Sequence, residues 1–122
     1  MIGAEVEGAL AGWIGFRPLY GNYTWELHPL AVDPAFAGRG IGGALVSEGE
    51  RILAERGAGG VLLGSDDPDG STSLGGRDLS SADLFDEINH IRNLKRHPFE
   101  FYRKLGYRIV GIVPDAAAGL DL

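Results

Sequence analysis

The amino-acid sequence predicts a mixed fold of the α/β (α+β) class. Two observations support this prediction. The apolar patterns follow the order β-β-β-α-β-α-α-β, so three strands precede the first helix, instead of strands and helices alternating from the start. The chain has 122 residues, 44% of them hydrophobic, which suffices for one core but not for separate cofactor and substrate domains. We therefore expect a single domain spanning residues 1–122.

Composition excludes several classes of function. The chain has no cysteine and three histidines without metal-ligand spacing, so we expect no disulfide, no metal site and a reducing, cytoplasmic compartment. A net charge of −6 disfavours nucleic-acid binding and is compatible with a small cationic partner, although solubility by itself accounts for the charge. No apolar run approaches the roughly 18 residues of a membrane span, and Met1-Ile2-Gly3 lacks the basic start of a signal peptide, so no membrane partner is expected.

The first third of the chain reads as strands. Residues 2–20 are apolar with interspersed glycines and predict two strands joined by a turn near Glu7-Gly8. Residues 23–32 predict a third strand, which Asp33-Pro34 ends. Because Pro29 has no N–H, this strand should lose its pairing on one side at that point.

The remainder predicts three helices and two strands. A helix is expected from about residue 40 to 56, with Gly57 as its C-terminal stop, followed by a short buried strand at 61–64 and a loop at 65–79. A capping pattern at 80–83 predicts a second helix. Its apolar side comprises Leu84, Phe85, Ile88, Ile91 and Leu94. Pro98 and Gly106 bound a third helix, and residues 107–113 predict a last strand.

The segment GRGIGGALV, residues 38–46, fits two ligand motifs. As G-x-G-x-x-G it matches a dinucleotide fingerprint, but that motif normally follows the first strand, and the acid Asp66 lies late for a ribose contact. As R-G-x-G-x-x-L it matches a loop for the pyrophosphate of coenzyme A. A third interpretation is a tight turn without a ligand. Successive backbone N–H groups at a helix N-terminus favour an anion. These groups belong to Arg39, Gly40, Ile41, Gly42 and Gly43.

Three further segments carry a family resemblance. They are WELHPLAV at 25–32, LGSDD at 63–67 and HPFEFYRKLGY at 97–107. Together with the glycine loop, they resemble the GNAT acetyltransferases and, more specifically, the aminoglycoside 6′-N-acetyltransferases. Ala37 departs from the Gln or Arg usual at that position. The resemblance also implies a strand and two helices ahead of Met1 and a strand beyond Asp115, so the chain resembles a shortened member.

The resemblance implies a fold and an activity. The fold would be a GNAT-type, largely antiparallel mixed sheet flanked by helices, with a splayed central pair formed by the strands of Glu26 and Val61. The activity would be direct transfer of acetyl from acetyl-CoA to the 6′-amine of an aminoglycoside, giving antibiotic resistance, in a chain that we expect to form a homodimer. Two alternatives remain open: acetylation of another amine, such as a polyamine or a protein N-terminus, and a shortened, non-catalytic coenzyme A-binding module.

The same resemblance assigns roles to coenzyme-binding residues. The backbone N–H of Leu30 would point at the acetyl carbonyl, and the backbone of Val32 would bind the pantetheine arm. The pyrophosphate would lie on the glycine loop. The loop residues are Arg39, Gly40, Ile41, Gly42, Gly43 and Ala44.

Substrate and proton-transfer roles fall on five other residues. Glu26 would orient the cationic substrate and could act as a base through water, and Asp66 and Asp67 would lie near the substrate cleft. His28, on the same strand face as Glu26, could relay a proton or be structural. Tyr102 would be the general acid that protonates the leaving thiolate, with core packing as the alternative.

Overall fold

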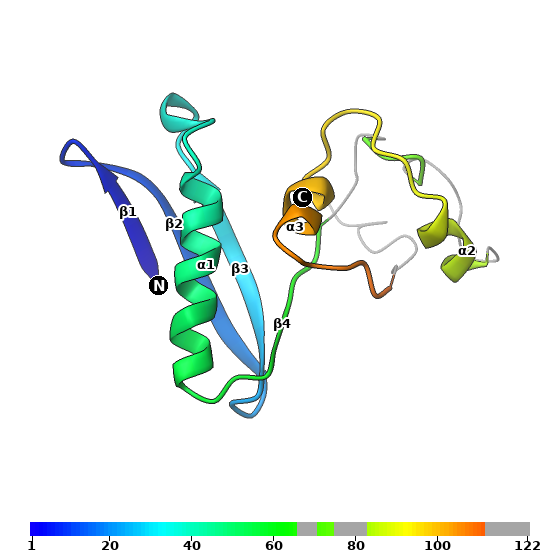
Figure 1. Ribbon diagram of the computed structural model, residues 1–122, viewed down its shortest axis with the longest axis horizontal. Helices are drawn as coiled ribbons and strands as arrows, with labels where there is room; N and C mark the ends of the chain where they lie inside the picture. Colours follow the sequence, from blue (N-terminus) through cyan, green and yellow to red (C-terminus); the bar gives the residue numbers. More distant parts are fainter. Residues whose placement is uncertain (66–70, 75–82, 112–122) are drawn as a thin grey trace, which may run out of the picture. The chain divides into compact units, whose positions relative to one another are not determined.

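The computed structural model describes residues 1–65, 71–74 and 83–111 (Figure 1). The chain divides into two compact units, Met1–Gly64 and Ser65–Leu122. The first unit holds a four-stranded sheet and one long helix, and the described part of the second holds two short helices. A single domain over 1–122 stays a prediction.

The sheet of the first unit has the strand order β1-β2-β3-β4. Strands β1 (Ile2–Val6), β2 (Ala9–Tyr20) and β3 (Thr24–Val32) form an antiparallel meander, and β4 (Gly60–Leu62) adds in parallel to β3. The predicted mixed, largely antiparallel sheet is confirmed. A parallel partner needs a crossover, and here the crossover is a helix.

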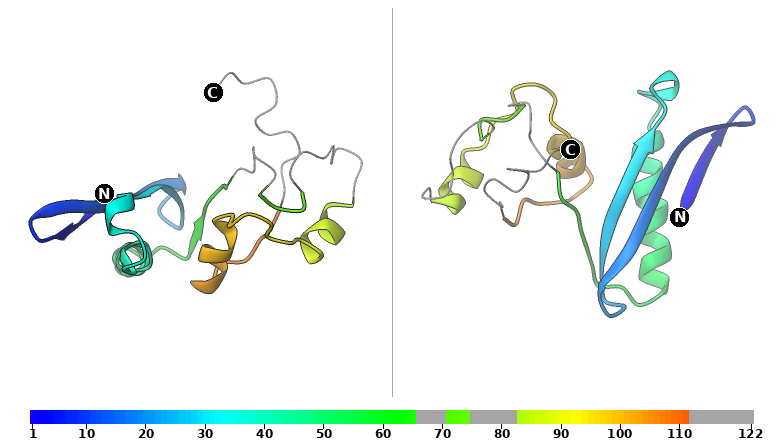
Figure 2. Two further views of the ribbon diagram at one scale, coloured as in Figure 1. Left: turned by 90° about the horizontal axis from the view of Figure 1, so that it is seen from above. Right: turned by 180° about the vertical axis from the view of Figure 1, so that it is seen from behind.

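One helix covers one face of this sheet, as both views of Figure 2 show for β1, β2 and β3. Helix α1 (Ile41–Glu55) follows the 3-10 turn η1 (Pro34–Phe36), and its C-cap is Arg56. The predicted helix over about 40–56 is confirmed. Asp33 caps η1, because its Oδ1 accepts a hydrogen bond of 2.9 Å from the N–H of Ala35.

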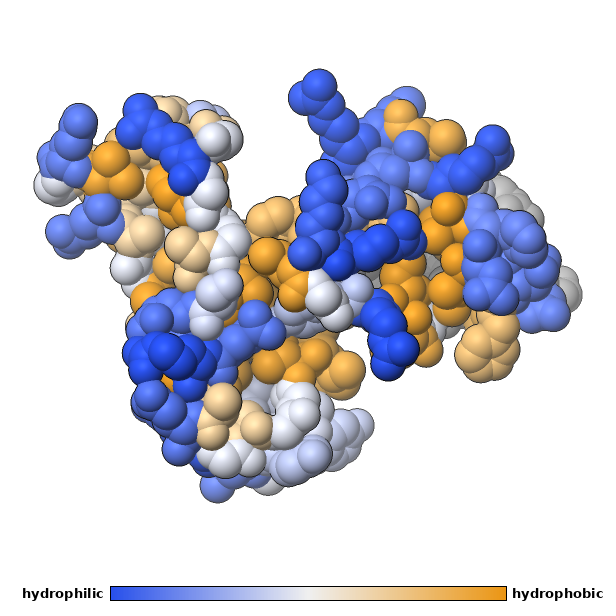
Figure 3. Space-filling model, viewed as in Figure 1, coloured by the Kyte–Doolittle hydropathy of each residue, from blue (hydrophilic) through white to orange (hydrophobic). Residues whose placement is uncertain are grey.

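The core of the first unit lies between α1 and the sheet. Ile14 and Val46 are fully buried, and the remaining buried apolar residues of this unit are Ala11, Leu27, Ile41, Leu45 and Leu53. Gly49 is buried where α1 crosses β2: a Cβ there would lie 2.3 Å from Cε2 of Phe16. Only glycine lets the helix and the phenyl ring pack at this distance. The outer face of α1 is polar, and Figure 3 shows hydrophilic residues over its C-terminal half.

The second unit contains α2 (Leu84–Asn89) and α3 (Phe99–Lys104). Asp83 is the N-cap of α2, because its Oδ1 accepts a 3.2 Å bond from the N–H of Asp86; the helix predicted after residues 80–83 is confirmed, whereas Ser80 and Ser81 of the capping pattern lie outside the described residues. His97 is buried and accepts a 3.1 Å bond from the N–H of Phe99 at the start of α3. The αL conformation of Gly106, with φ +97°, follows the C-cap of α3 at Leu105.

Two sequence predictions for this unit are wrong. The second helix ends at Asn89 and does not reach Leu94, because residues 92–94 pair with residues 71–73: the N–H of Ser73 donates to the carbonyl of Arg92 at 2.9 Å, and the N–H of Leu94 donates to the carbonyl of Ser71 at 2.7 Å. The described residues 107–111 of the predicted last strand form no strand. A strand needs a pairing partner, and a run of apolar and β-branched residues does not by itself supply one.

Candidate functional site

The glycine loop is built to present backbone N–H groups. Gly38 and Gly40 have φ of +78° and +76°, which is left-handed backbone that glycine adopts without a Cβ penalty. Gly40 is the N-cap of α1 and has no side chain to bond the first turn. The first backbone bond of the helix runs from the N–H of Ala44 to the carbonyl of Gly40, at 3.0 Å.

The amides ahead of Ala44 are therefore free to bind a ligand. In the described structure, none of the five N–H groups from Arg39 to Gly43 has a backbone partner outside the helix, and the first turn offers none inside it. The helix dipole adds roughly half a positive charge there. Arg39 is exposed at this end, with its guanidinium 5.3 Å from the centre of the Phe36 ring. The amide of Ala44 is already bonded, so only its exposed side chain is available to a ligand.

Strand β3 provides a second set of free backbone groups. The β3–β4 register runs only from Thr24↔Gly60 to Glu26↔Leu62, whereas β3 continues to Val32. The strands part at Glu26, which is the splayed central pair that the resemblance implies.

Strand parity shows which groups face the splay. The N–H of Asp33 bonds the carbonyl of Ala11 on β2 at 2.7 Å. Ala31, two residues earlier, has the same orientation toward β2. Leu30 and Val32 flank Ala31 and alternate with it, so their N–H and C=O groups point to the other edge of β3. That edge has no β4 partner at these residues. It can pair with an extended ligand rich in amide groups.

A bulge in β3 lies immediately before this edge. The register passes from Phe16↔Leu27 to Ile14↔Leu30, so His28 and Pro29 together oppose one residue of β2. The His28–Pro29 peptide bond is cis. The predicted loss of regular pairing at Pro29 is confirmed.

Glu26 lies on the sheet face opposite α1. Side chains that follow one another along a strand point to opposite faces of the sheet. Leu27, the next residue, is buried on the α1 side and is the cross-strand partner of Phe16, so Glu26 points to the other face. The Glu26 side chain is 24% exposed and its Oε1 accepts a bond from Nε of Arg17, its direct cross-strand partner. Sequence reasoning missed Arg17. Counting from the turn would not have found it. Tyr20 pairs with Thr24 around residues 21–23, and regular pairing from there would place Arg17 opposite Leu27, whereas the irregularity between Pro18 and Tyr20 shifts Arg17 onto Glu26.

His28 and Tyr102 differ in their surroundings. His28 is exposed, and no contact joins it to Glu26 in the described structure. Tyr102, on α3 of the second unit, is half-buried and packs edge-on against Phe101 and Tyr107, at 5.0 and 5.8 Å between ring centres. Burial raises the pKa of the Tyr102 phenol above its usual 10.0, so it stays protonated at neutral pH.

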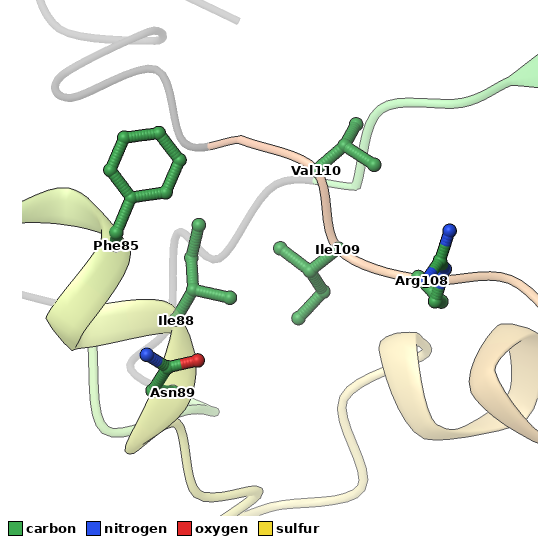
Figure 4. A pocket seen from close by; sticks show the side chains of 6 residues that line it. All are labelled: Phe85, Ile88, Asn89, Arg108, Ile109 and Val110. Atoms are coloured by element: carbon green, nitrogen blue, oxygen red, sulfur yellow. The ribbon is translucent and has the colours of Figure 1, made fainter.

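Two predicted substrate residues and one hollow in the second unit do not extend the described site. Asp66 and Asp67 lie outside the described residues. A hollow of about 370 Å³ in the second unit lies between α2 and residues 108–110, and none of the predicted site residues lines it (Figure 4). Phe85, Ile88 and Ile109 face into it. Among the described residues, no group of three or more His, Asp or Glu side chains could hold a metal, and no helix has the length and apolar character to cross a membrane.

The family comparison and two solved structures point to the same family of enzymes. Residues 1–72 match the Acetyltransferase (GNAT) family. A crystal structure of an aminoglycoside 6′-N-acetyltransferase complexed with coenzyme A is 45% identical, with a TM-score of 0.87 over 93% of this chain. The aminoglycoside 6′-N-acetyltransferase from Enterococcus faecium is also 45% identical, with a TM-score of 0.86 over 93% of this chain.

A curated relative has a different substrate class. The N-alpha-acetyltransferase RimI of Mycobacterium tuberculosis is 41% identical over 49 residues, which are 38% of this chain. The chain spans 31% of that relative, and 63% and 64% of the two aminoglycoside acetyltransferase chains.

Proposed function

Because the chain belongs to the GNAT acetyltransferase family, we propose that it transfers acetyl from acetyl-CoA to a primary amine of an aminoglycoside, the 6′-amine. The observation that supports this most is the unpaired edge of β3, which leads through η1 directly into the free amides of the glycine loop. The 45% identity to aminoglycoside 6′-N-acetyltransferases supports the substrate class. Acetylating an aminoglycoside amine removes a positive charge from the drug, which is the basis of a role in antibiotic resistance.

The residues fit acetyl-CoA in two places. The diphosphate of the coenzyme is a dianion, and the amides from Arg39 to Gly43 offer it several donors at a helix N-terminus, with the guanidinium of Arg39 beside them. The amide-containing pantetheine arm matches the free edge of β3 at Val32. Bound acetyl-CoA supplies the activated acetyl group as a thioester.

The chain's own groups then perform four tasks. The N–H of Leu30 donates to the acetyl oxygen, where negative charge develops during the reaction. Glu26 holds the substrate ammonium, and this contact aligns the amine. One amine proton leaves through water or through the exposed His28. Tyr102 donates its phenolic proton to the departing thiolate; the phenol is protonated at neutral pH, as a general acid must be, and its raised pKa makes it a weaker acid than an exposed tyrosine.

Asp66 and Asp67 complete the proposed substrate site. Both follow β4 closely in sequence, and two carboxylates attract a polycation. Their neutralisation in Asp66→Asn/Asp67→Asn should raise KM for aminoglycosides and leave KM for acetyl-CoA unchanged.

The experiment measures free thiol released from acetyl-CoA, with and without a kanamycin-type aminoglycoside. We expect aminoglycoside-dependent release that falls on the order of 10²-fold in Tyr102→Phe. Tyr107→Phe is the matched control, because it removes another hydroxyl from the same aromatic cluster. If the wild type released no thiol although coenzyme A raised its melting temperature, the chain would bind coenzyme A without catalysing acetyl transfer.

A second substrate class follows from the RimI similarity. That relative is an N-alpha-acetyltransferase, so a protein N-terminus is the alternative amine. A panel of aminoglycosides, polyamines and short peptides with free N-termini separates the two. Peptide turnover exceeding aminoglycoside turnover in kcat/KM would favour the alternative.

We also propose a homodimer and a cytoplasmic location. In the described structure β1 pairs only with β2, so its outer edge is open to another chain. The cysteine-free sequence suits a reducing compartment. Light scattering after size exclusion tests the dimer, and a stable monomer at high concentration would refute it.

A further inference from the structure

Arg17 has no role in the function proposed above, yet it touches the residue that would hold the substrate. It is the only Lys or Arg in β2 and β3, Glu26 is the only Asp or Glu there, and the register places the two directly opposite. The guanidinium Nε donates to Oε1 of Glu26. The Glu26 carboxylate, which we propose binds the substrate ammonium, therefore already has a cationic partner, Arg17, in the same chain.

The second carboxylate oxygen remains open. The structure gives Oε2 of Glu26 no partner among the described residues, and the pair lies on the sheet face that α1 does not cover. An ammonium that approaches this oxygen must share the carboxylate with Arg17 or displace it. It then meets a carboxylate whose charge is compensated and a guanidinium of like charge beside it.

The ion pair is weakly held. The Arg17 side chain is 64% exposed, and exposed ion pairs contribute little stability, so displacement of the guanidinium by a substrate has a low free-energy cost. Competition and like-charge repulsion both weaken the binding of an amine. Both act on the charged ammonium, so they belong to the binding step that precedes the loss of its proton.

We propose that Arg17 is a specificity-determining residue that competes with the substrate ammonium for Glu26 and repels the polycation as it approaches. This inference rests on the proposed function, because it assumes that Glu26 receives the substrate amine. Arg17 acts through affinity, so its effect belongs to KM and not to kcat. Screening by salt weakens both the ion pair and the repulsion, so the effect of Arg17 shrinks as ionic strength rises.

The test compares Arg17→Gln with the wild type in steady-state acetylation of a kanamycin-type aminoglycoside. We expect KM for the aminoglycoside to fall roughly two- to fivefold at low salt, with kcat and KM for acetyl-CoA unchanged. Arg51→Gln is the matched control. It removes the same charge from α1, where Arg51 pairs with Glu48 and Glu55, and should leave KM unchanged.

Two additional measurements complete the test. In a Glu26→Gln background, Arg17→Gln should lose most of its effect on KM, because the competition acts on that carboxylate. Calorimetric titration of the aminoglycoside in the presence of coenzyme A should show the same tightening without turnover.

The outcomes separate the two proposals. A wild type that acetylates the aminoglycoside, combined with an unchanged or raised KM in Arg17→Gln, overturns the role of Arg17 alone. An equal fall in KM for Arg51→Gln also overturns it, because the effect is then one of net charge. A wild type that neither binds nor acetylates the aminoglycoside overturns the proposed function, and the inference with it.

Discussion

Substituting Gly40 by alanine tests whether the glycine loop needs its left-handed backbone. Gly40 caps α1 at φ +76°, and a Cβ there would meet no atom within 4 Å. The effect of Gly40→Ala therefore comes from backbone strain and not from a clash. Left-handed backbone costs a non-glycine residue about 1–2 kcal/mol. Alanine also restricts the unfolded chain, which offsets about 0.4–1 kcal/mol.

Subtracting the chain-entropy gain from the backbone strain, we expect Gly40→Ala to lower the free energy of unfolding by about 1 kcal/mol. For a chain of 122 residues this corresponds to a fall of roughly 3–5 °C in melting temperature. The amides of the first turn should also be less well placed for a diphosphate, so coenzyme A should raise the melting temperature less than in the wild type.

Urea unfolding followed by circular dichroism measures the first effect, and melting with and without coenzyme A measures the second. Gly64→Ala is the matched control: a Cβ there also meets nothing within 4 Å, and Gly64 is not among the glycines with positive φ. It should be neutral or slightly stabilising. If Gly40→Ala were as stable as Gly64→Ala, the argument from the αL N-cap would be refuted.

Three further predictions concern packing and pH. Gly49→Val should destabilise the fold by about 2–3 kcal/mol in urea, because its Cβ would lie 2.3 Å from the Phe16 ring; an unchanged midpoint would contradict the packing of α1 on β2. Burial raises the pKa of Glu50 above 4.5, so the wild type loses stability as pH rises through the folded-state value, and Glu50→Gln should be the more stable protein at pH 7 but not below about pH 4. A pH-independent difference would argue against this cause. Burial also raises the pKa of Tyr102 above 10.0, so Tyr102→Phe should lose less stability than the wild type as pH rises beyond 10, measured by urea unfolding at each pH.

Local sequence patterns determined much of the fold. The 3.6-residue apolar period and the flanking glycines located α1 within one residue at each end, because helix boundaries depend on groups close in the chain. The strands β1 to β3 and the bulge at Pro29 follow equally from local patterns, since a missing N–H interrupts a ladder wherever the strand lies. The glycine loop and the WELHPLAV segment also identified the part of the chain whose free backbone groups suit coenzyme A.

The tertiary structure decided the pairings. The apolar segment predicted a strand at 107–113, but its described part forms none, since a strand depends on a partner that is distant in sequence. The register of β2 against β3 placed Arg17 on Glu26, and the end of the β3–β4 ladder at Glu26 opened the edge at Leu30 and Val32. The residue types along the chain specify which groups could bind a coenzyme and an amine. Only long-range strand pairing decides which of these groups are left free and which are already occupied, because a backbone amide or a carboxylate is available to a ligand only where no neighbouring strand has used it.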